Sequence, residues 1–236
     1  MSTSNKHTIS FETTAELQQA VALASADVIR EAVNNRGIAN VSLSGGSTPR
    51  RIYQLLAEED LPWDQIHWFW GDERNVTSDS DQSNERMVRE TLLSHQHTPE
   101  SQIHPVTVDV DQPAIGAQAY EKILREHFLG NDTPQWDLVL LGLGDDAHTA
   151  SLFPGTKALQ EKDRWFVENW VEQMNTFRYT LTAPAINSGR NIWFLVAGEG
   201  KREALRNVWS EQHAPTEYPS QLICPTAWYI TSDAKP

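Results

Sequence analysis

The chain has 236 residues, of which 39% are hydrophobic and 9% aromatic, a composition that supports a folded core and excludes a disordered or collagen-like chain. Thirty-two acidic residues against nineteen basic ones give a formal net charge of −13, which disfavours binding to nucleic acid or to an anionic membrane. The single cysteine, Cys224, excludes an intrachain disulfide and a cysteine-based metal site. The first residues have no apolar run typical of a signal peptide, and no apolar stretch could span a bilayer. We therefore expect a cytoplasmic protein that contacts neither membrane nor nucleic acid.

Strand-like and helix-like segments alternate along almost the entire chain. In chain order, the hydrophobic pattern predicts a strand at 8–11, a helix at 14–33, a strand at 38–43, a helix at 50–56, a strand at 66–70, a helix at 83–93, a short apolar segment at 103–106, a helix at 114–129, strands at 137–141, 165–171, 177–181 and 191–196, a helix from 201 to 209 and a last strand at 222–230. This alternation indicates an α/β fold of the Rossmann type, with a mainly parallel sheet and helices on both faces. Because no internal repeat or long linker interrupts it, we expect residues 1–236 to form a single domain.

Four of the predicted strands run directly into a polar loop that contains glycine. These loops cover residues 44–48, 71–74, 142–148 and 198–201. In open α/β sheets, ligands bind outside the carboxyl ends of the strands. The sequence therefore predicts that the four loops converge on one crevice.

The first of these loops has the sequence Ser44-Gly45-Gly46-Ser47-Thr48-Pro49 and joins a strand to a helix. Its glycines allow the backbone to approach a ligand closely, and the start of the helix offers free N–H groups and a positive dipole end to a phosphate. The spacing of a P-loop is absent. The alternative interpretation is a tight turn in which a serine or threonine side chain caps the helix.

The second and fourth loops carry basic residues. Arg74 follows Asp72 and Glu73 at a strand end, and its planar guanidinium matches phosphate oxygens. Lys201 lies in the first turn of a predicted helix, where a cation is unfavourable against the helix dipole, and this indicates a ligand. The alternatives are an ion pair within the loop for Arg74 and a solvated side chain for Lys201. In a chain with a net charge of −13, cations at this sheet edge favour an anionic ligand.

The third loop contains Asp146-Ala147-His148. A histidine can act as a general base near neutral pH, and a carboxylate beside it can orient the ring and stabilise its protonated form. The alternative is a structural histidine that pairs with Asp145. Because the chain has no G-x-S-x-G nucleophile elbow, water is the expected nucleophile if the protein is a hydrolase.

Two other patterns carry less weight. Gly142-x-Gly144-x-x-Ala147 matches a dinucleotide-binding fingerprint, but it lies in the middle of the chain, and Asp145 and Asp146 would face the pyrophosphate. We therefore do not expect NAD binding. His95, His97 and His104 are close in sequence, but no acidic or cysteine partner accompanies them, so we predict no metal site there.

Taken in order, these segments resemble the 6-phosphogluconolactonase family, and the resemblance covers nearly the whole chain. The motifs that carry it are SGGSTP at 44–49, WGDERNV at 70–76, SN at 83–84, LGLGDDAHTASLFP at 141–154, RYTLT at 178–182 and GEGK at 198–201. The segment from His148 to Pro154 is highly specific, whereas the glycine-serine loop alone would be weak.

The resemblance implies hydrolysis of 6-phospho-D-glucono-1,5-lactone to 6-phosphogluconate in the oxidative pentose phosphate pathway, with no metal and no organic cofactor. It implies that His148 activates water against the lactone carbonyl and returns the proton to the ring oxygen, and that Asp146 orients His148. The same match gives the expected contacts to the substrate and its phosphate: Gly45, Gly46, Ser47, Thr48, Asp72, Arg74, Arg178 and Lys201. The only partner implied is this small molecule, for a monomer or a small homo-oligomer.

The chain departs from the family pattern at Ala147, where the family usually has glycine. If this position has a positive φ, alanine costs on the order of 1 kcal/mol or shifts the loop. Residues 172–177 also lack the prolines expected there.

Two alternatives to a lactonase remain open. The sister family of glucosamine-6-phosphate deaminases and isomerases shares the fold but carries a glutamate five residues after the histidine, where this chain has Phe153. This difference favours a lactonase. The other alternative is a non-catalytic sugar-phosphate-binding protein, against which the intact Asp146 and His148 argue.

Overall fold

A seven-stranded sheet, parallel throughout, forms the centre of the molecule in the computed structural model, which describes residues 7–94 and 98–236. Its strand order is β1-β10-β9-β6-β2-β3-β5. The strands are β1 (Thr8–Phe11), β2 (Ala39–Leu43), β3 (Ile66–Trp70), β5 (Ile103–His104), β6 (Leu138–Gly142), β9 (Ile192–Val196) and β10 (Ala227–Thr231). The predicted α/β fold with a mainly parallel sheet is confirmed.

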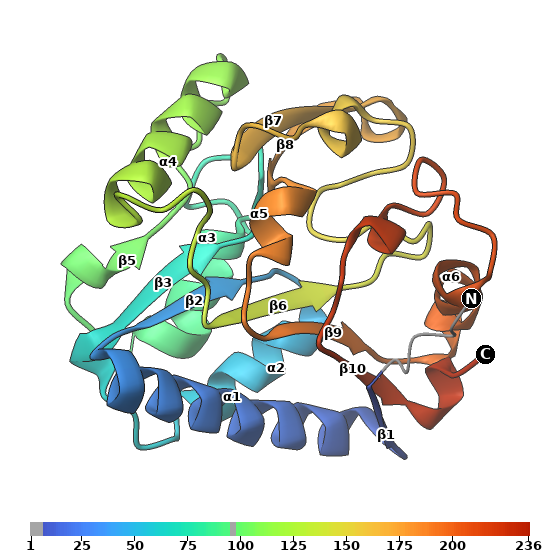
Figure 1. Cartoon of the computed structure of the whole chain (residues 1–236), viewed down its shortest axis with the longest axis horizontal. Helices are drawn as coiled ribbons and strands as arrows, with labels where there is room; N and C mark the ends of the chain where they lie inside the picture. The colour runs from blue at the N-terminus through green and yellow to red at the C-terminus, as the bar shows by residue number, and fades with distance from the viewer. Residues whose placement is uncertain (1–6, 95–97) are drawn as a thin grey trace.

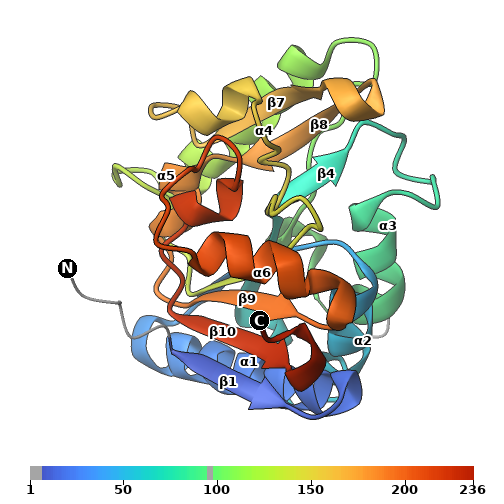
Figure 2. The ribbon, with the colours of Figure 1, turned by 90° about the vertical axis from the view of Figure 1, so that its right-hand side faces the viewer.

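Helices cover both faces of this sheet, as predicted. They are α1 (Thr14–Arg36), α2 (Ser47–Leu56), α3 (Asn84–Val88), α4 (Pro113–His127), α5 (Ala183–Asn187) and α6 (Arg202–Trp209). Figures 1 and 2 show α1 and α2 along one face, and α4, α5 and α6 on the other. Among the helices of the described residues, none combines the length and the apolar character needed to cross a membrane.

A second, smaller sheet lies above the face that carries α4 and α5 (Figure 1). It is antiparallel, with the order β4-β8-β7, and consists of β4 (Asp72–Arg74), β7 (Phe166–Val171) and β8 (Thr176–Leu181). The sequence predicts only a polar loop at 71–74, and this prediction is wrong for Asp72–Arg74. Three polar residues carry no apolar alternation, so only their pairing with β8 makes them a strand.

Gly71 is the point at which the chain passes from the large sheet to the small one. Its N–H donates to the carbonyl of Leu43 at 2.8 Å, and its carbonyl accepts from the N–H of Leu181 at 2.8 Å. A Cβ at this position would lie 3.1 Å from Ser42 Oγ and 3.3 Å from the Leu43 carbonyl oxygen. The close approach of three strands therefore explains why a residue without a side chain stands here.

The helix ends follow capping chemistry more closely than hydrophobic periodicity. Thr13 and Glu16 form a capping box at the start of α1, and Gly37, with φ +82°, ends the helix three residues beyond the predicted end. α2 begins at Ser47 rather than after Pro49, because a proline in the first turn loses no intrahelical hydrogen bond. The predicted strand at 222–230 is wrong in its first half, since Pro219–Leu222 forms a 3-10 turn and β10 starts at Ala227.

The strand order reverses between β2 and β6. From β2 the chain adds β3 and β5 on one side, and then returns through α4 to place β6, β9 and β10 on the other. In open α/β sheets, such a reversal separates the loops at the carboxyl ends and creates the ligand crevice. Here those loops are the ones after Leu43 and after Gly142.

Three histidines gather at the other edge of the sheet, under α4. One ring nitrogen from each of His67, His104 and His127 lies within 4.8 Å of the other two, and all three side chains are partly buried. His67 Nδ1 and His104 Nε2 share a hydrogen bond of 3.0 Å, and the His104 ring stacks on Phe69 with centroids 4.3 Å apart. Burial, reinforced by the neighbouring histidines, lowers the pKa of His104 and of His127 to about 4.

This histidine cluster makes the stability of the fold dependent on pH. The unfolded chain binds protons at these residues near pH 6.5, whereas the folded chain binds them near pH 4, so the free energy of unfolding falls as the pH falls between these values. Between pH 7 and pH 5, the free energy of unfolding should therefore fall further in wild type than in the His104→Gln/His127→Gln variant. After allowance for the partial exposure of the rings, we expect this difference to be about 1–2 kcal/mol. Urea unfolding at both pH values measures this difference, and equal losses would contradict it.

Candidate functional site

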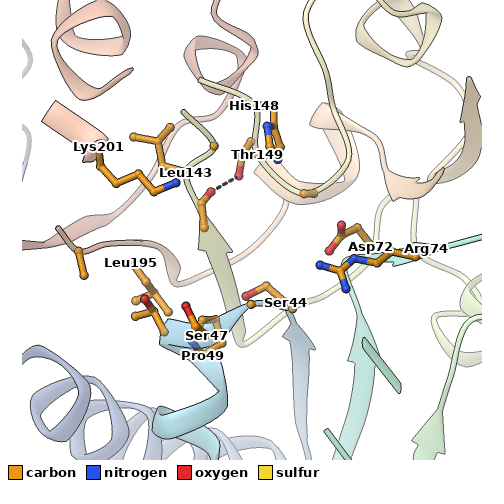
Figure 3. A pocket seen from close by; sticks show the side chains of 17 residues that line it. Ser44, Ser47, Pro49, Asp72, Arg74, Leu143, His148, Thr149, Leu195 and Lys201 are labelled. Carbon is orange, nitrogen blue, oxygen red and sulfur yellow. Dashed lines mark hydrogen bonds between the residues drawn. The ribbon is translucent and has the colours of Figure 1, made fainter. Parts of the chain in front are cut away.

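The four polar loops singled out in the sequence do converge on one crevice. A cavity of about 250 Å³ lies at the carboxyl ends of β2, β6 and β9, and each loop contributes to its wall (Figure 3). The residues that line it are Ser44, Gly45, Gly46, Ser47, Thr48, Pro49, Asp72, Arg74, Gly142, Leu143, Gly144, His148, Thr149, Ala150, Leu195, Ala197 and Lys201. Of the expected site residues, Asp146 and Arg178 stand just outside this lining.

The first wall is the start of α2. Gly46 is its N-cap, with φ +112°, and no side chain caps the helix, so the alternative of a serine or threonine cap is wrong. The first N–H groups of a helix have no partner within the helix, and Ser47 and Thr48 present theirs at the cavity. This end of α2 also carries no acidic residue in its first turn. The loop therefore has the features of an anion-binding helix N-terminus.

Two buried tyrosines hold the strand ends that lead into the site. Tyr53 Oη accepts from the N–H of Ser44 at 2.9 Å and donates to its carbonyl at 2.8 Å. Tyr120 Oη accepts in the same way from the N–H of Trp70 at 3.0 Å. Burial raises the pKa of both hydroxyls, so each stays neutral and can both donate and accept. Sequence reasoning missed both tyrosines, because each reads as an ordinary core residue of an amphipathic helix.

The second wall is β4. Asp72 is 8% exposed, and its Oδ2 accepts from Ser151 Oγ at 2.8 Å. Within residues 7–94 and 98–236, Arg74 forms no ion pair: its Nη1 donates to the Gln82 carbonyl at 2.6 Å. The alternative of an ion pair inside the loop is therefore wrong, and the guanidinium of Arg74 lies at the cavity, where Asp72 is the neighbouring carboxylate.

Glu73 has a structural role that the sequence did not reveal. It is 1% exposed and accepts from the backbone N–H groups of Asn84 at 2.8 Å and Glu85 at 2.7 Å, at the start of α3. Burial raises the pKa of Glu73, although these hydrogen bonds oppose the rise. Glu73 therefore anchors α3 against β4 and faces away from the ligand cavity, whose lining does not include it.

The third wall carries the histidine. His148 Nδ1 lies 2.5 Å from Asp146 Oδ1, and the same oxygen accepts from the His148 N–H at 3.1 Å. Burial would raise the pKa of Asp146, but its hydrogen bonds and charge interaction with His148 outweigh burial and lower the pKa. An ionised Asp146 requires a proton on Nδ1, which leaves the lone pair of the neutral ring on Nε2. His148 is thus held in the tautomer that can accept a proton at the cavity.

Packing fixes the ring of His148 as firmly as the carboxylate does. Phe153 stacks on it with centroids 4.1 Å apart, and Phe153 is 3% exposed. On the side of Gly144, a Cβ would overlap the imidazole and approach Asp146 Oδ1 to 2.7 Å. The loop itself is tied to the rest of the fold, because Ser220 Oγ donates to the Ala147 carbonyl at 2.7 Å.

Lys201 and Arg178 complete the cationic residues near the site. Lys201 Nζ forms an ion pair of 2.7 Å with Asp145, whose side chain is 82% exposed, so Lys201 is neither free nor merely solvated. Arg178 pairs with Arg74 in the register of β4 and β8. Burial, and then the charge of Arg74, lower the pKa of Arg178. Two guanidinium groups on adjacent strands therefore leave a positive region beside the cavity that an anion would neutralise.

The third loop does not have the geometry of a dinucleotide site. After β6 the chain enters turns and a 3-10 turn before β7, and no α-helix starts at Gly144. The fingerprint needs a helix N-terminus at this point to receive the pyrophosphate, and this loop does not supply one.

Comparisons with known proteins decide the family. The model of the glucosamine-6-phosphate isomerase/6-phosphogluconolactonase family matches residues 12–231. The chain belongs to this family. It is 43% identical to a 6-phosphogluconolactonase of Synechocystis over 211 residues, covering 87% of each chain. It is also 43% identical to that of Nostoc over 196 residues, covering 82% of this chain and 81% of the relative.

Solved structures of the family superpose over nearly the whole chain. A 6-phosphogluconolactonase from Trypanosoma cruzi gives a TM-score of 0.85 at 28% identity, covering 99% of this chain and 97% of the other. A monomeric glucosamine-6-phosphate deaminase gives a TM-score of 0.77 at 22% identity, covering 97% and 98%, and this likeness shows the common fold alone. The resemblance stated from the motifs is therefore confirmed at the level of the family.

Ala147, which stands where the family usually has glycine, does have a positive φ. Its φ is +63°, in the left-handed region, and the residue is 1% exposed. In this conformation the His148 N–H donates to Asp146 Oδ1, and Ser220 Oγ donates to the Ala147 carbonyl. The contacts of Ser220 and Asp146 on either side hold the strained residue in place.

This conformation gives a prediction for stability. In Ala147→Gly, relief of about 1–2 kcal/mol of left-handed strain is offset by the loss of one buried methyl, about 0.8 kcal/mol, and by the entropy of glycine, about 0.5–1 kcal/mol. We therefore expect the free energy of unfolding to change by less than about 1 kcal/mol. Ala147→Val adds bulk at a buried site with positive φ and should lower it by more than about 2 kcal/mol. Urea unfolding measures both, and a mildly destabilised Ala147→Val would contradict the strained conformation.

Proposed function

We propose that this protein is a 6-phosphogluconolactonase that hydrolyses 6-phospho-D-glucono-1,5-lactone to 6-phospho-D-gluconate in the oxidative pentose phosphate pathway. The observation that carries the proposal is the His148–Asp146 pair, bonded at 2.5 Å, on the wall of a cavity that also holds the N-terminus of α2 and the unpaired Arg74 (Figure 3). The similarity to 6-phosphogluconolactonases of the same family supports this substrate. A single domain formed by residues 1–236 would carry the activity.

In the proposed reaction, His148 acts as a general base. Its Nε2 takes a proton from a water molecule as the water oxygen attacks the lactone carbonyl carbon, which gives a tetrahedral intermediate. The bond from that carbon to the ring oxygen then breaks, and His148 returns the proton to the leaving ring oxygen, so the open-chain acid forms. Asp146 keeps Nδ1 protonated and stabilises the imidazolium while it lasts. These steps need no metal ion and no organic cofactor.

The phosphate of the substrate would lie at the cationic side of the cavity. The first N–H groups of α2, at Ser47 and Thr48 next to Gly45 and Gly46, and the guanidinium of Arg74 would supply hydrogen-bond donors. Lys201 would exchange Asp145 for the phosphate, and Arg178 would add positive charge from the neighbouring strand. The role of Asp72 is to position this wall, since Ser151 and the Asn84 amide both bond to it, with Asn84 Nδ2 donating to the Asp72 carbonyl at 2.9 Å.

Phe153 separates this proposal from an aldose–ketose isomerase. The sister enzymes carry a carboxylate at this position for ring opening, whereas here an aromatic ring covers one face of His148. A purely binding function does not explain why the chain holds His148 in the proton-accepting tautomer. We further propose that the enzyme acts in the cytoplasm on this small molecule, as a monomer or small homo-oligomer, with no nucleic-acid or membrane partner.

Hydrolysis assays with three substrates test the proposal. We expect rapid opening of freshly prepared 6-phosphogluconolactone above the spontaneous rate, much slower opening of the unphosphorylated lactone, and no turnover of glucosamine 6-phosphate. His148→Ala should lower kcat by about 100-fold or more, because it removes the base, while leaving the unfolding curve nearly unchanged. His213→Ala, on an exposed loop, is the matched control. Turnover of glucosamine 6-phosphate, or a near-normal kcat in His148→Ala, would overturn the assignment.

The phosphate site gives a prediction of a different kind. Arg74→Ala and Lys201→Ala should raise KM by about 10-fold or more with a smaller change in kcat, because both residues bind a group that does not react. For the unphosphorylated lactone, the same variants should behave as wild type. Steady-state kinetics on both lactones measure this, and an unchanged KM in both variants would place the phosphate elsewhere.

A further inference from the structure

The histidine cluster under α4 has no part in the proposed hydrolysis. None of His67, His104 and His127 lines the ligand cavity, and each comes from a different element: β3, β5 and the end of α4. The cluster was not visible in the sequence, where these residues are separated by tens of positions. His104 was considered only together with His95 and His97, which lie outside the described residues.

We propose that His67, His104 and His127 bind one divalent transition-metal ion of the zinc type. Three imidazole nitrogens with a fourth position open to water are a common ligand set for zinc, and imidazole also suits copper and nickel. The proposal is independent of the proposed hydrolase function.

The spacing of the three rings is close to what an ion requires. Bonds of about 2.0–2.1 Å in a tetrahedral site place two ligand nitrogens about 3.3 Å apart. Here His67 Nδ1 and His104 Nε2 are 3.0 Å apart, and the three candidate nitrogens all lie within 4.8 Å of one another. Movements of about 1 Å, of the kind that side-chain rotations provide, would complete the site.

The contact between His67 and His104 also suits a metal. In this 3.0 Å hydrogen bond, one of the two rings has to donate a proton to the other. An ion bound by both nitrogens would remove that need, because each neutral ring could then offer a lone pair.

A second shell orients His127. Its Nε2 lies 2.7 Å from Asn40 Oδ1, and the amide of Asn40 is itself oriented, because Nδ2 donates to the Gln135 carbonyl at 3.3 Å. Nε2 of His127 is then the protonated nitrogen, and Nδ1 carries the lone pair. Hydrogen bonds of this kind accompany metal-bound histidines and fix the ring orientation.

A cavity of about 310 Å³ borders one member of the cluster, His127, and its lining is separate from that of the ligand cavity. Arg36 and Arg190 also line this cavity, and their charges would repel a cation. Both lie near Asp137 Oδ1, with Arg36 Nη2 at 2.6 Å and Arg190 Nε at 3.7 Å. The nearly buried Asp137 therefore offsets part of their charge.

Zinc titration of the purified, untagged chain tests the proposal, with Cys224→Ser in every protein to remove the exposed thiol. We expect one Zn²⁺ per chain in competition with a chromogenic chelator, and at least tenfold weaker binding in His104→Gln and in His127→Gln. His213→Gln is the matched control and should bind as the parent does. Cobalt should give the visible absorption of a four-coordinate ion in the parent and not in the cluster variants.

The outcomes separate this site from other zinc-binding groups and from the hydrolase. Zinc should raise the Tm of the parent but not of His127→Gln, and lactone opening should be the same with and without a chelator. His127 is the last residue of α4, where a substitution disturbs the sheet less than one in β5 does. His127→Gln therefore still tests the proposal if His104→Gln does not fold. The proposal would be overturned if the parent showed no saturable zinc binding, or if both cluster variants bound zinc as tightly as His213→Gln does. Loss of the zinc site in His148→Gln would also overturn it.

Discussion

The reversal of strand order between β2 and β6 is the constraint on which the rest of the site depends. Parallel neighbours end at the same edge of a sheet, and the reversal lets their two following loops diverge and leave a crevice. One loop turns into α2 and brings unpaired N–H groups, while the other stays irregular and brings His148. An anion-binding wall and a proton-accepting wall therefore face one cavity because of topology, before any side chain contributes specificity.

Buried polar contacts convert this topology into a fixed geometry. Tyr53 and Tyr120 each bond to backbone groups at a strand end, and both hydroxyls remain neutral because burial raises their pKa. The carboxylate of Glu73 similarly accepts from a backbone N–H group at the start of α3. Such groups would each cost free energy if left unpaired in the core, so their pairing selects one arrangement of the loops. At the cavity, Ser151 fixes the buried carboxylate of Asp72 in the same way, and Asp146 together with the stacked ring of Phe153 fixes His148.

The sequence was sufficient for the main fold and for most of the residues at the cavity, for identifiable reasons. Buried parallel strands are short apolar runs, and glycine-bearing loops mark their carboxyl ends, so β2, β3, β6 and β9 and their loops could be predicted. β4 could not, because Asp72–Arg74 is a strand only through its partner β8. The histidine cluster could not either, since its members meet only when α4 packs over β3 and β5. Local patterns predict local structure, and contacts between distant segments need the fold.

The distribution of charge shows how an acidic chain can still bind an acidic ligand. The net charge of −13 repels anions at long range, but screening confines such repulsion to about 8–10 Å at physiological salt. At short range, Arg74 is held by a neutral carbonyl, and Lys201 by the exposed Asp145. An exposed ion pair contributes about 0–1 kcal/mol, so exchanging Asp145 for a ligand phosphate costs little. Under the proposed function, Asp145 would therefore hold Lys201 beside the cavity and release it to the phosphate of the substrate, whereas a buried partner in the same place would block this exchange.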